Sequence, residues 1–119
     1  MLKFALATIC LSSSLIALPA AAQRSGTYAV QGADASGTRY EGSATLTATG
    51  PETWRITWRV AGATSNGIGL MVRGMLVIGY ISERETGTAA YEVMPDGRLV
   101  GRWTQGREGG VGTETLLPR

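Results

Sequence analysis

Histidine is absent from the 119 residues of this chain, and cysteine and lysine occur once each, as Cys10 and Lys3. Beyond residue 10 the chain therefore has no Ser-His-Asp or Cys-His nucleophile, no zinc site built from His or Cys, and no Schiff-base lysine. Carboxylates, hydroxyls and arginines remain as the candidates for chemistry. We therefore expect a protein that is not an enzyme and that carries no cofactor or metal ion.

The first 22 residues have the pattern of a removable export signal. Lys3 supplies a positive charge, residues 4–18 are almost wholly apolar, and residues 19–22 offer the small side chains of a cleavage site. A membrane span needs about 20 apolar residues, and this run is shorter. We expect a cleaved signal peptide over 1–22, a mature chain over 23–119 that is periplasmic or secreted, and no stable membrane anchor after cleavage.

The mature chain is long enough for a single small domain. Cleavage would remove Cys10, the only cysteine, so that no disulfide could form. The 11 basic residues nearly balance the 9 acidic ones, which argues against a nucleic-acid partner. All 17 glycines lie beyond the expected signal, as is typical of a turn-rich β protein, and the oligomeric state is left open.

Alternation with a period of two residues is clearest between Tyr40 and Val60, on either side of a turn at Gly50. It predicts a hairpin with one buried face and one wet face. The buried face would carry Tyr40, Gly42, Ala44, Leu46 and Ala48 from the first strand and Trp54, Ile56, Trp58 and Val60 from the second. Either favoured register sets Gly42 or Ala44 opposite Trp58, which makes steric sense.

Further short strands are expected at 27–32, 64–71, 75–80, 89–94, 98–104 and 113–117, and no stretch has helical periodicity. The clearest turn is the Met94–Gly97 stretch, in which Pro95 sets φ and Gly97 accepts a left-handed backbone. About eight short antiparallel strands predict an all-β meander. A closed barrel of the calycin type is favoured over a sandwich.

Two groups of side chains are candidates for binding. Aromatic residues could line the mouth of a barrel or pack its core, and these are Trp54, Trp58, Trp103, Tyr28, Tyr40, Tyr80 and Tyr91. On the opposite, outer face of the hairpin, Arg39, Arg55, Arg59 and Glu41 form a mixed polar surface that could receive a protein or polysaccharide.

Glu114 is the acidic residue of most interest, because it lies in the C-terminal strand and follows a glycine-rich segment at 106–112. That segment lacks the lysine and the helix of a phosphate loop, so we expect a hairpin tip. Glu114 is a candidate binding residue, and the alternative is an ion pair with an arginine such as Arg102.

Glycines and aromatic residues recur in short motifs along nearly the whole mature chain, including Gly26-Thr27-Tyr28, Tyr40-Glu41-Gly42, Gly67-Ile68-Gly69, Gly101-Arg102-Trp103 and Gly112-Thr113-Glu114. With these motifs the chain resembles a family of small exported proteobacterial proteins labelled fibronectin-binding protein. The resemblance implies adhesion to an extracellular-matrix glycoprotein such as fibronectin. A fainter likeness to lipocalin and avidin barrels comes from Gly101-Arg102-Trp103 and the many short strands.

Three functions follow from these observations. The first is a non-catalytic exported binding protein whose partner is an extracellular protein, as the family resemblance implies. The alternative is a barrel that binds a small ligand in an aromatic-lined interior. A carboxylate-dependent hydrolase is a remote third, because the chain retains acidic residues but none of the other common catalytic groups.

Overall fold

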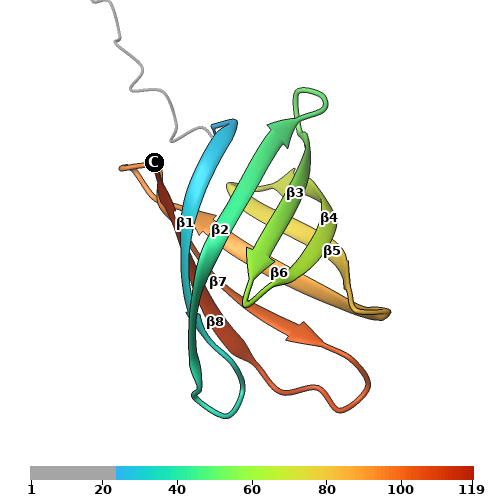
Figure 1. The fold of residues 1–119 in the computed structure, drawn as a ribbon. Coiled ribbons are helices and arrows are strands. Elements are labelled where there is room, and N and C mark those ends of the chain that lie inside the picture. Colours follow the sequence, from blue (N-terminus) through green and yellow to red (C-terminus); the bar gives the residue numbers. More distant parts are fainter. Residues whose placement is uncertain (1–23) are drawn as a thin grey trace, which may run out of the picture.

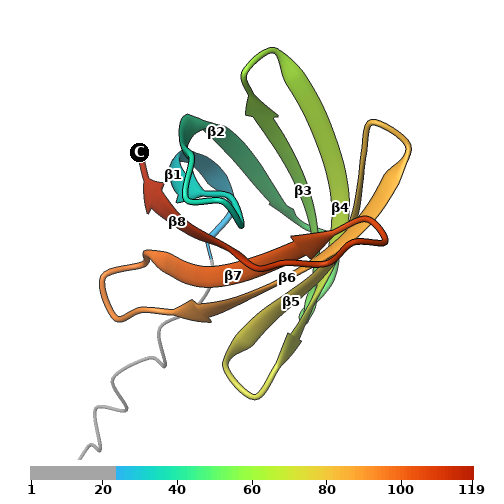
Figure 2. The ribbon, with the colours of Figure 1, turned by 90° about the horizontal axis from the view of Figure 1, so that it is seen from below.

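The computed structural model describes residues 24–119, and the expected signal peptide lies outside the described residues. The chain forms eight antiparallel strands, which are β1 (Gly26–Ala33), β2 (Arg39–Ala48), β3 (Thr53–Val60), β4 (Ala63–Val72), β5 (Met75–Ser82), β6 (Glu85–Val93), β7 (Leu99–Gln105) and β8 (Gly112–Pro118). Each strand pairs with the next, and β8 pairs with β1 to close a barrel (Figures 1 and 2). The expected all-β barrel is confirmed. The described part of the chain has no helix long and apolar enough to cross a membrane.

The β2–β3 hairpin has one of the two expected registers, in which Ala44 lies opposite Trp58. Trp54, Ile56 and Trp58 are buried, whereas Arg55 and Arg59 between and beyond them are exposed. The barrel interior is therefore built by the same two-residue alternation that the sequence shows. The turn at Met94–Gly97 also forms as expected, because the Gly97 amide donates to the Met94 carbonyl at 2.9 Å and Gly97 has a φ of 89°.

One strand begins earlier than expected. We expected β6 from residue 89, but pairing with β5 starts at Glu85 and includes Thr86, Gly87 and Thr88. A glycine between two threonines is a weak strand signal on its own. Pairing with β5, which sets Gly87 opposite Tyr80, extends the strand through this stretch.

The two ends of the barrel interior differ. Mainly aliphatic side chains fill the half nearer the β2–β3, β4–β5 and β6–β7 turns, and these are Val30, Leu46, Ile56, Leu76, Ile78, Leu99 and Leu116. Two buried aromatic residues, Tyr28 and Trp54, also pack in this half. Aromatic side chains occupy the other half, which lies below the first in Figure 1 and carries the β1–β2, β3–β4, β5–β6 and β7–β8 connections. The aliphatic half supplies the packed core, so the aromatic half is free to shape a site.

Four interior aromatic side chains lie opposite glycines of the neighbouring strand. A Cβ atom added at any of these glycines would collide with the facing ring, so each ring covers bare backbone. The pairs are Tyr40 with Gly32, Tyr80 with Gly87, Tyr91 with Gly101 and Trp103 with Gly112. Large rings fit inside so narrow a barrel because the opposite residue has no side chain.

Gly101→Ala is expected to destabilise the fold by about 1–3 kcal/mol, because its Cβ would meet the Ala90 carbonyl oxygen and the Tyr91 ring. Gly79→Ala is the matched control, since its Cβ would meet no atom within 4 Å, and we expect a change within about 0.5 kcal/mol. Urea denaturation measures both. Equal stabilities of the two variants would contradict this account of the interior.

Candidate functional site

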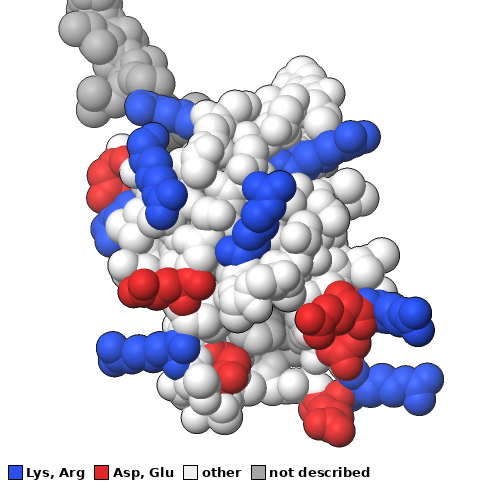
Figure 3. Space-filling model, viewed as in Figure 1, with Lys and Arg blue, Asp and Glu red and all other residues white. Residues whose placement is uncertain are grey.

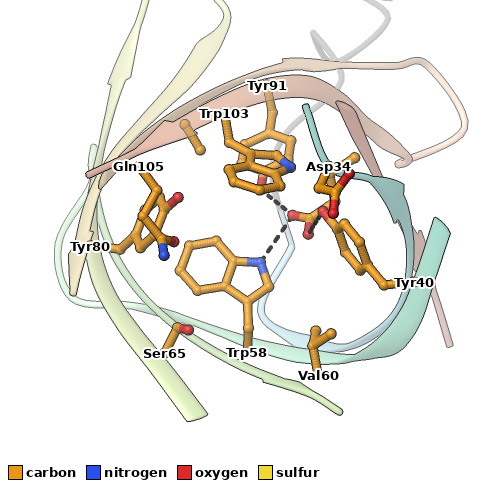
Figure 4. Close-up of a pocket in the computed structure, with 11 residues that line it drawn as sticks. Asp34, Tyr40, Trp58, Val60, Ser65, Tyr80, Tyr91, Trp103 and Gln105 are labelled. Atoms are coloured by element: carbon orange, nitrogen blue, oxygen red, sulfur yellow. Dashed lines mark hydrogen bonds between the residues drawn. The ribbon is translucent and has the colours of Figure 1, made fainter. Parts of the chain in front are cut away.

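A cavity of about 230 Å³ lies in the aromatic half of the barrel (Figure 4). It is lined by Asp34, Tyr40, Trp58, Val60, Ser65, Tyr80, Ala89, Tyr91, Trp103, Gln105 and Glu114, which come from every strand except β1 and from the β1–β2 connection. The walls of this pocket are mainly aromatic rings.

The Glu114 carboxylate is the polar centre of this pocket. Its side chain is only 6% exposed, and it accepts hydrogen bonds from three neutral donors on three other strands. Tyr40 Oη donates to Oε1 at 2.9 Å, Trp58 Nε1 donates to Oε2 at 3.0 Å, and Tyr91 Oη donates to Oε2 as well. Figure 4 shows these bonds converging on the carboxylate inside the barrel. A buried carboxylate thus has its oxygens satisfied.

Burial raises the pKa of Glu114, while the hydrogen bonds from Tyr91, Tyr40 and Trp58 act in the opposite direction. Burial and the nearby Glu114 charge also raise the pKa values of Tyr40 and Tyr91, and that of Tyr80 to about 12. The three tyrosines therefore keep their protons and act as neutral donors. No arginine lines the pocket.

Asp34 adds a second carboxyl group at the pocket. It closes the β1–β2 turn by accepting hydrogen bonds from the Ser36 amide and hydroxyl and from the Thr38 amide. The Ser36 hydroxyl, followed by the Thr38 amide, lowers the pKa of Asp34, so the side chain is anionic at neutral pH.

The aromatic rings of the pocket are set at steep angles to one another. Trp58 and Tyr80 have ring centroids 5.3 Å apart and an interplanar angle of 62°, and Tyr40 and Trp103 lie 6.2 Å apart at 65°. These are edge-to-face pairs, so both faces and edges of the rings line the walls. Trp103 Nε1 is buried without a hydrogen-bond partner among the described residues.

The structure brings most of the expected interior residues together. Tyr40, Trp58, Tyr91, Trp103 and Glu114 all line the pocket. Trp54 is also interior, but it lies toward the other end of the barrel and packs in the core. The four residues expected on the outer face, Arg39, Glu41, Arg55 and Arg59, are all exposed there.

The suggested ion pair of Glu114 with Arg102 is wrong. Arg102 lies opposite Thr113, the residue before Glu114, so alternation sends its side chain to the outer face while Glu114 points inward. The partners of Glu114 come instead from strands remote in the sequence. The glycine-rich segment at 106–111 does form the β7–β8 connection, as expected.

Several pocket residues were missing from the candidates chosen on sequence. Ser65 and Gln105 lie on inward-facing strand positions, so the alternation alone marks them as interior. Asp34 was expected only as a turn residue, which it is, and its approach to the pocket depends on barrel closure. Residues 24–119 contain no cluster of three or more acidic side chains able to hold a metal ion.

No family model matches this chain, and no curated protein sequence matches it either. Solved structures of designed proteins share its fold. A redesigned β-barrel aligns with a TM-score of 0.73 and 15% identity over 84% of this chain and 95% of its own. The redesigned barrel mFAP1, bound to DFHBI, aligns with a TM-score of 0.67 and 16% identity over 78% and 93% of the two chains. At these identities the likeness establishes the barrel fold.

Replacing Glu114 by glutamine is expected to change how stability depends on pH. Burial raises the pKa of Glu114 above the ordinary glutamate value of 4.5, so the folded state binds this proton more tightly than the unfolded state does. The stability that comes from this proton is fully present below pH 4.5 and is lost as the pH rises through the pKa of the folded state. Glu114→Gln lacks this proton, so the difference in unfolding free energy, wild type minus variant, should decrease as pH rises above 4.5.

Urea denaturation of both proteins at a series of pH values measures that difference. Glu41→Gln, on the exposed face of β2, is the control for loss of one negative charge, and we expect it to lie within about 0.5 kcal/mol of wild type. A difference between wild type and Glu114→Gln that stays constant across the series would rule out the linkage.

Proposed function

We propose that this chain is a non-catalytic binding protein that holds one small molecule in the aromatic half of its barrel. The observation that supports this most is the 230 Å³ cavity around Glu114, which stands beside an otherwise packed interior. A single domain of this size gains stability by filling its barrel. Ligand pockets usually combine apolar or aromatic walls with a few well-placed polar groups, and this cavity has both.

The size of the cavity limits the ligand. An apolar cavity of about 150 Å³ can hold benzene, so 230 Å³ has room for one ring or a branched group with a few further atoms. The designed barrel mFAP1 and the related barrel mFAP0, both bound to DFHBI, are examples of the same fold holding a small compound. A barrel of eight strands thus supports binding of this kind.

We infer binding rather than catalysis from the chemistry of the pocket. Its lining has no histidine, cysteine or lysine, and both oxygens of Glu114 already accept hydrogen bonds. A group held in this way orients a ligand better than it attacks one. With the expected export signal, the protein would bind its ligand in the periplasm or outside the cell.

Protein purified from its own host is expected to carry one molecule per chain, measured by native mass spectrometry. Ser65→Phe should lower this occupancy about tenfold or more, because a ring at this half-buried lining position enters the cavity. Thr64→Phe places the same ring on the outer face of β4 and should keep full occupancy. A folded Ser65→Phe that retains the molecule would contradict the proposal.

The outer surface supports a second candidate function, which is adhesion to an extracellular protein. β4 and β5 expose the apolar side chains of Ile68, Leu70, Val72, Val77 and Ile81, with Ile68 72% exposed. Ile68 lies opposite Arg55, so this apolar surface continues into the arginine-bearing face of β3. Figure 3 shows acidic and basic side chains interspersed on the barrel exterior. Apolar residues beside arginine are typical of protein interfaces.

A double change of Arg55 and Arg59 to Glu is expected to weaken binding to immobilised fibronectin at least about tenfold if this face is used. Surface plasmon resonance measures the affinity. Arg102→Glu with Arg107→Glu, on β7 and the β7–β8 connection four strands around the barrel from β3, gives the same change in net charge and should have little effect. Equal losses for both pairs would indicate nonspecific charge attraction.

A further inference from the structure

We propose that the ligand of the barrel pocket is a small organic cation, whose ammonium group lies between the Glu114 carboxylate and the surrounding aromatic rings. This inference rests on the proposed function of the pocket as a small-molecule site. It adds the chemical class of the ligand. The argument draws on the charge of the lining, the state of Glu114 and the arrangement of the rings.

The pocket lining carries acidic groups and no basic one. Glu114 and Asp34 are its charged residues, and none of the ten arginines of the chain lines the cavity. The arginines of the pocket-forming strands lie at outward positions, as Arg59 does beside Trp58 and Arg102 does beside Trp103. The interior is therefore a negative site inside a protein of nearly balanced charge.

The Glu114 carboxyl group is hydrogen-bonded inside the barrel, but no basic side chain of the pocket lining faces it. Tyr40, Trp58 and Tyr91 provide hydrogen bonds, but all three are uncharged donors. A buried charge with no opposite charge nearby is costly, and proteins ordinarily pair it. A ligand that brings a positive charge would supply the missing partner. An anion would instead face the Glu114 carboxyl group in a poorly screened interior, with the Asp34 carboxylate at the solvent-exposed rim.

The aromatic walls favour the same ligand. An ammonium group is attracted to the face of an aromatic ring, most strongly to tryptophan, and cages of such rings recognise quaternary ammonium groups. Trp58, Trp103, Tyr40, Tyr80 and Tyr91 surround this cavity (Figure 4). Trp58 and Tyr91 also donate to Glu114, which polarises their rings toward greater electron density. The Glu114 carboxylate and the faces of the aromatic rings would thus attract the same ammonium group.

Three probes of nearly the same shape test the proposal. They are choline, its uncharged tert-butyl analogue with carbon in place of nitrogen, and the anion tert-butylacetate. Binding is measured by quenching of tryptophan fluorescence and by NMR titration of the indole N–H signals. We expect choline to bind at least about 10-fold more tightly than the uncharged analogue, and tert-butylacetate to bind most weakly.

Two variants test whether the preference for choline over the uncharged analogue arises in the barrel pocket. Glu114→Gln should reduce the ratio of choline to uncharged-analogue affinity to near one, because it removes the charge and keeps the shape. Trp103→Leu removes a ring that makes no hydrogen bond among the described residues, and it should lower choline affinity several-fold while binding of the uncharged analogue changes less. If Glu114→Gln fails to fold, Trp103→Leu and the three probes on wild type still decide the matter.

Each outcome distinguishes this inference from the function on which it rests. Tighter binding of the uncharged analogue or of tert-butylacetate would overturn the cationic ligand and leave the small-molecule pocket in place. Equal affinities for all three probes would do the same. No binding of any probe to wild type would overturn both. A preference for choline that persists unchanged in folded Glu114→Gln and Trp103→Leu would place the cation elsewhere on the protein.

Discussion

The set of hydrogen bonds to the Glu114 carboxylate is the interaction on which the functional half of the barrel depends. It joins β8 to β2, β3 and β6 across the interior, through Tyr40, Trp58 and Tyr91. These donors fix the positions of three of the aromatic walls, and so they define the shape of the cavity. Removing one partner would leave a buried polar group unsatisfied, which costs about 1–3 kcal/mol. The same bonds that hold the site in shape keep a carboxyl group inside it.

The pairing of glycine with a facing ring makes this arrangement possible. A barrel of eight strands has a narrow interior, and large rings on adjacent strands would compete for it. Placing Gly32, Gly87, Gly101 and Gly112 opposite aromatic residues lets each ring cover its neighbour's backbone and leaves the centre open. Glycine weakens a strand locally, and the covering ring offsets that loss. The glycine-rich composition thus has a structural purpose beyond the turns.

The fold was largely predictable from the sequence, because alternation with a period of two is a local property. It identified the inner faces of β2 and β3, limited the residue opposite Trp58 to Gly42 or Ala44, of which Ala44 is found, and favoured the closed meander. The site was predictable only in part. Alternation marks Tyr40, Trp58, Tyr91, Trp103 and Glu114 as interior, but it does not say which interior positions are packed and which surround a cavity. The same alternation, applied to Arg102 and Glu114, argues against pairing these two residues.

The sequence by itself determined the class of chemistry available to this protein: without histidine, and with its only cysteine and lysine inside the expected signal, the mature chain retains aromatic, hydroxyl, acidic and arginine side chains. It also determined the strands, since each needs only its own pattern. Tertiary structure alone decided that Trp54 packs in the core while Trp58 and Trp103 line a pocket, and that Glu114 meets donors 74, 56 and 23 residues away. The reason is that closure of the barrel sets the relative heights of the strands, and with them which side chains meet across the interior. No local stretch of the chain contains that information.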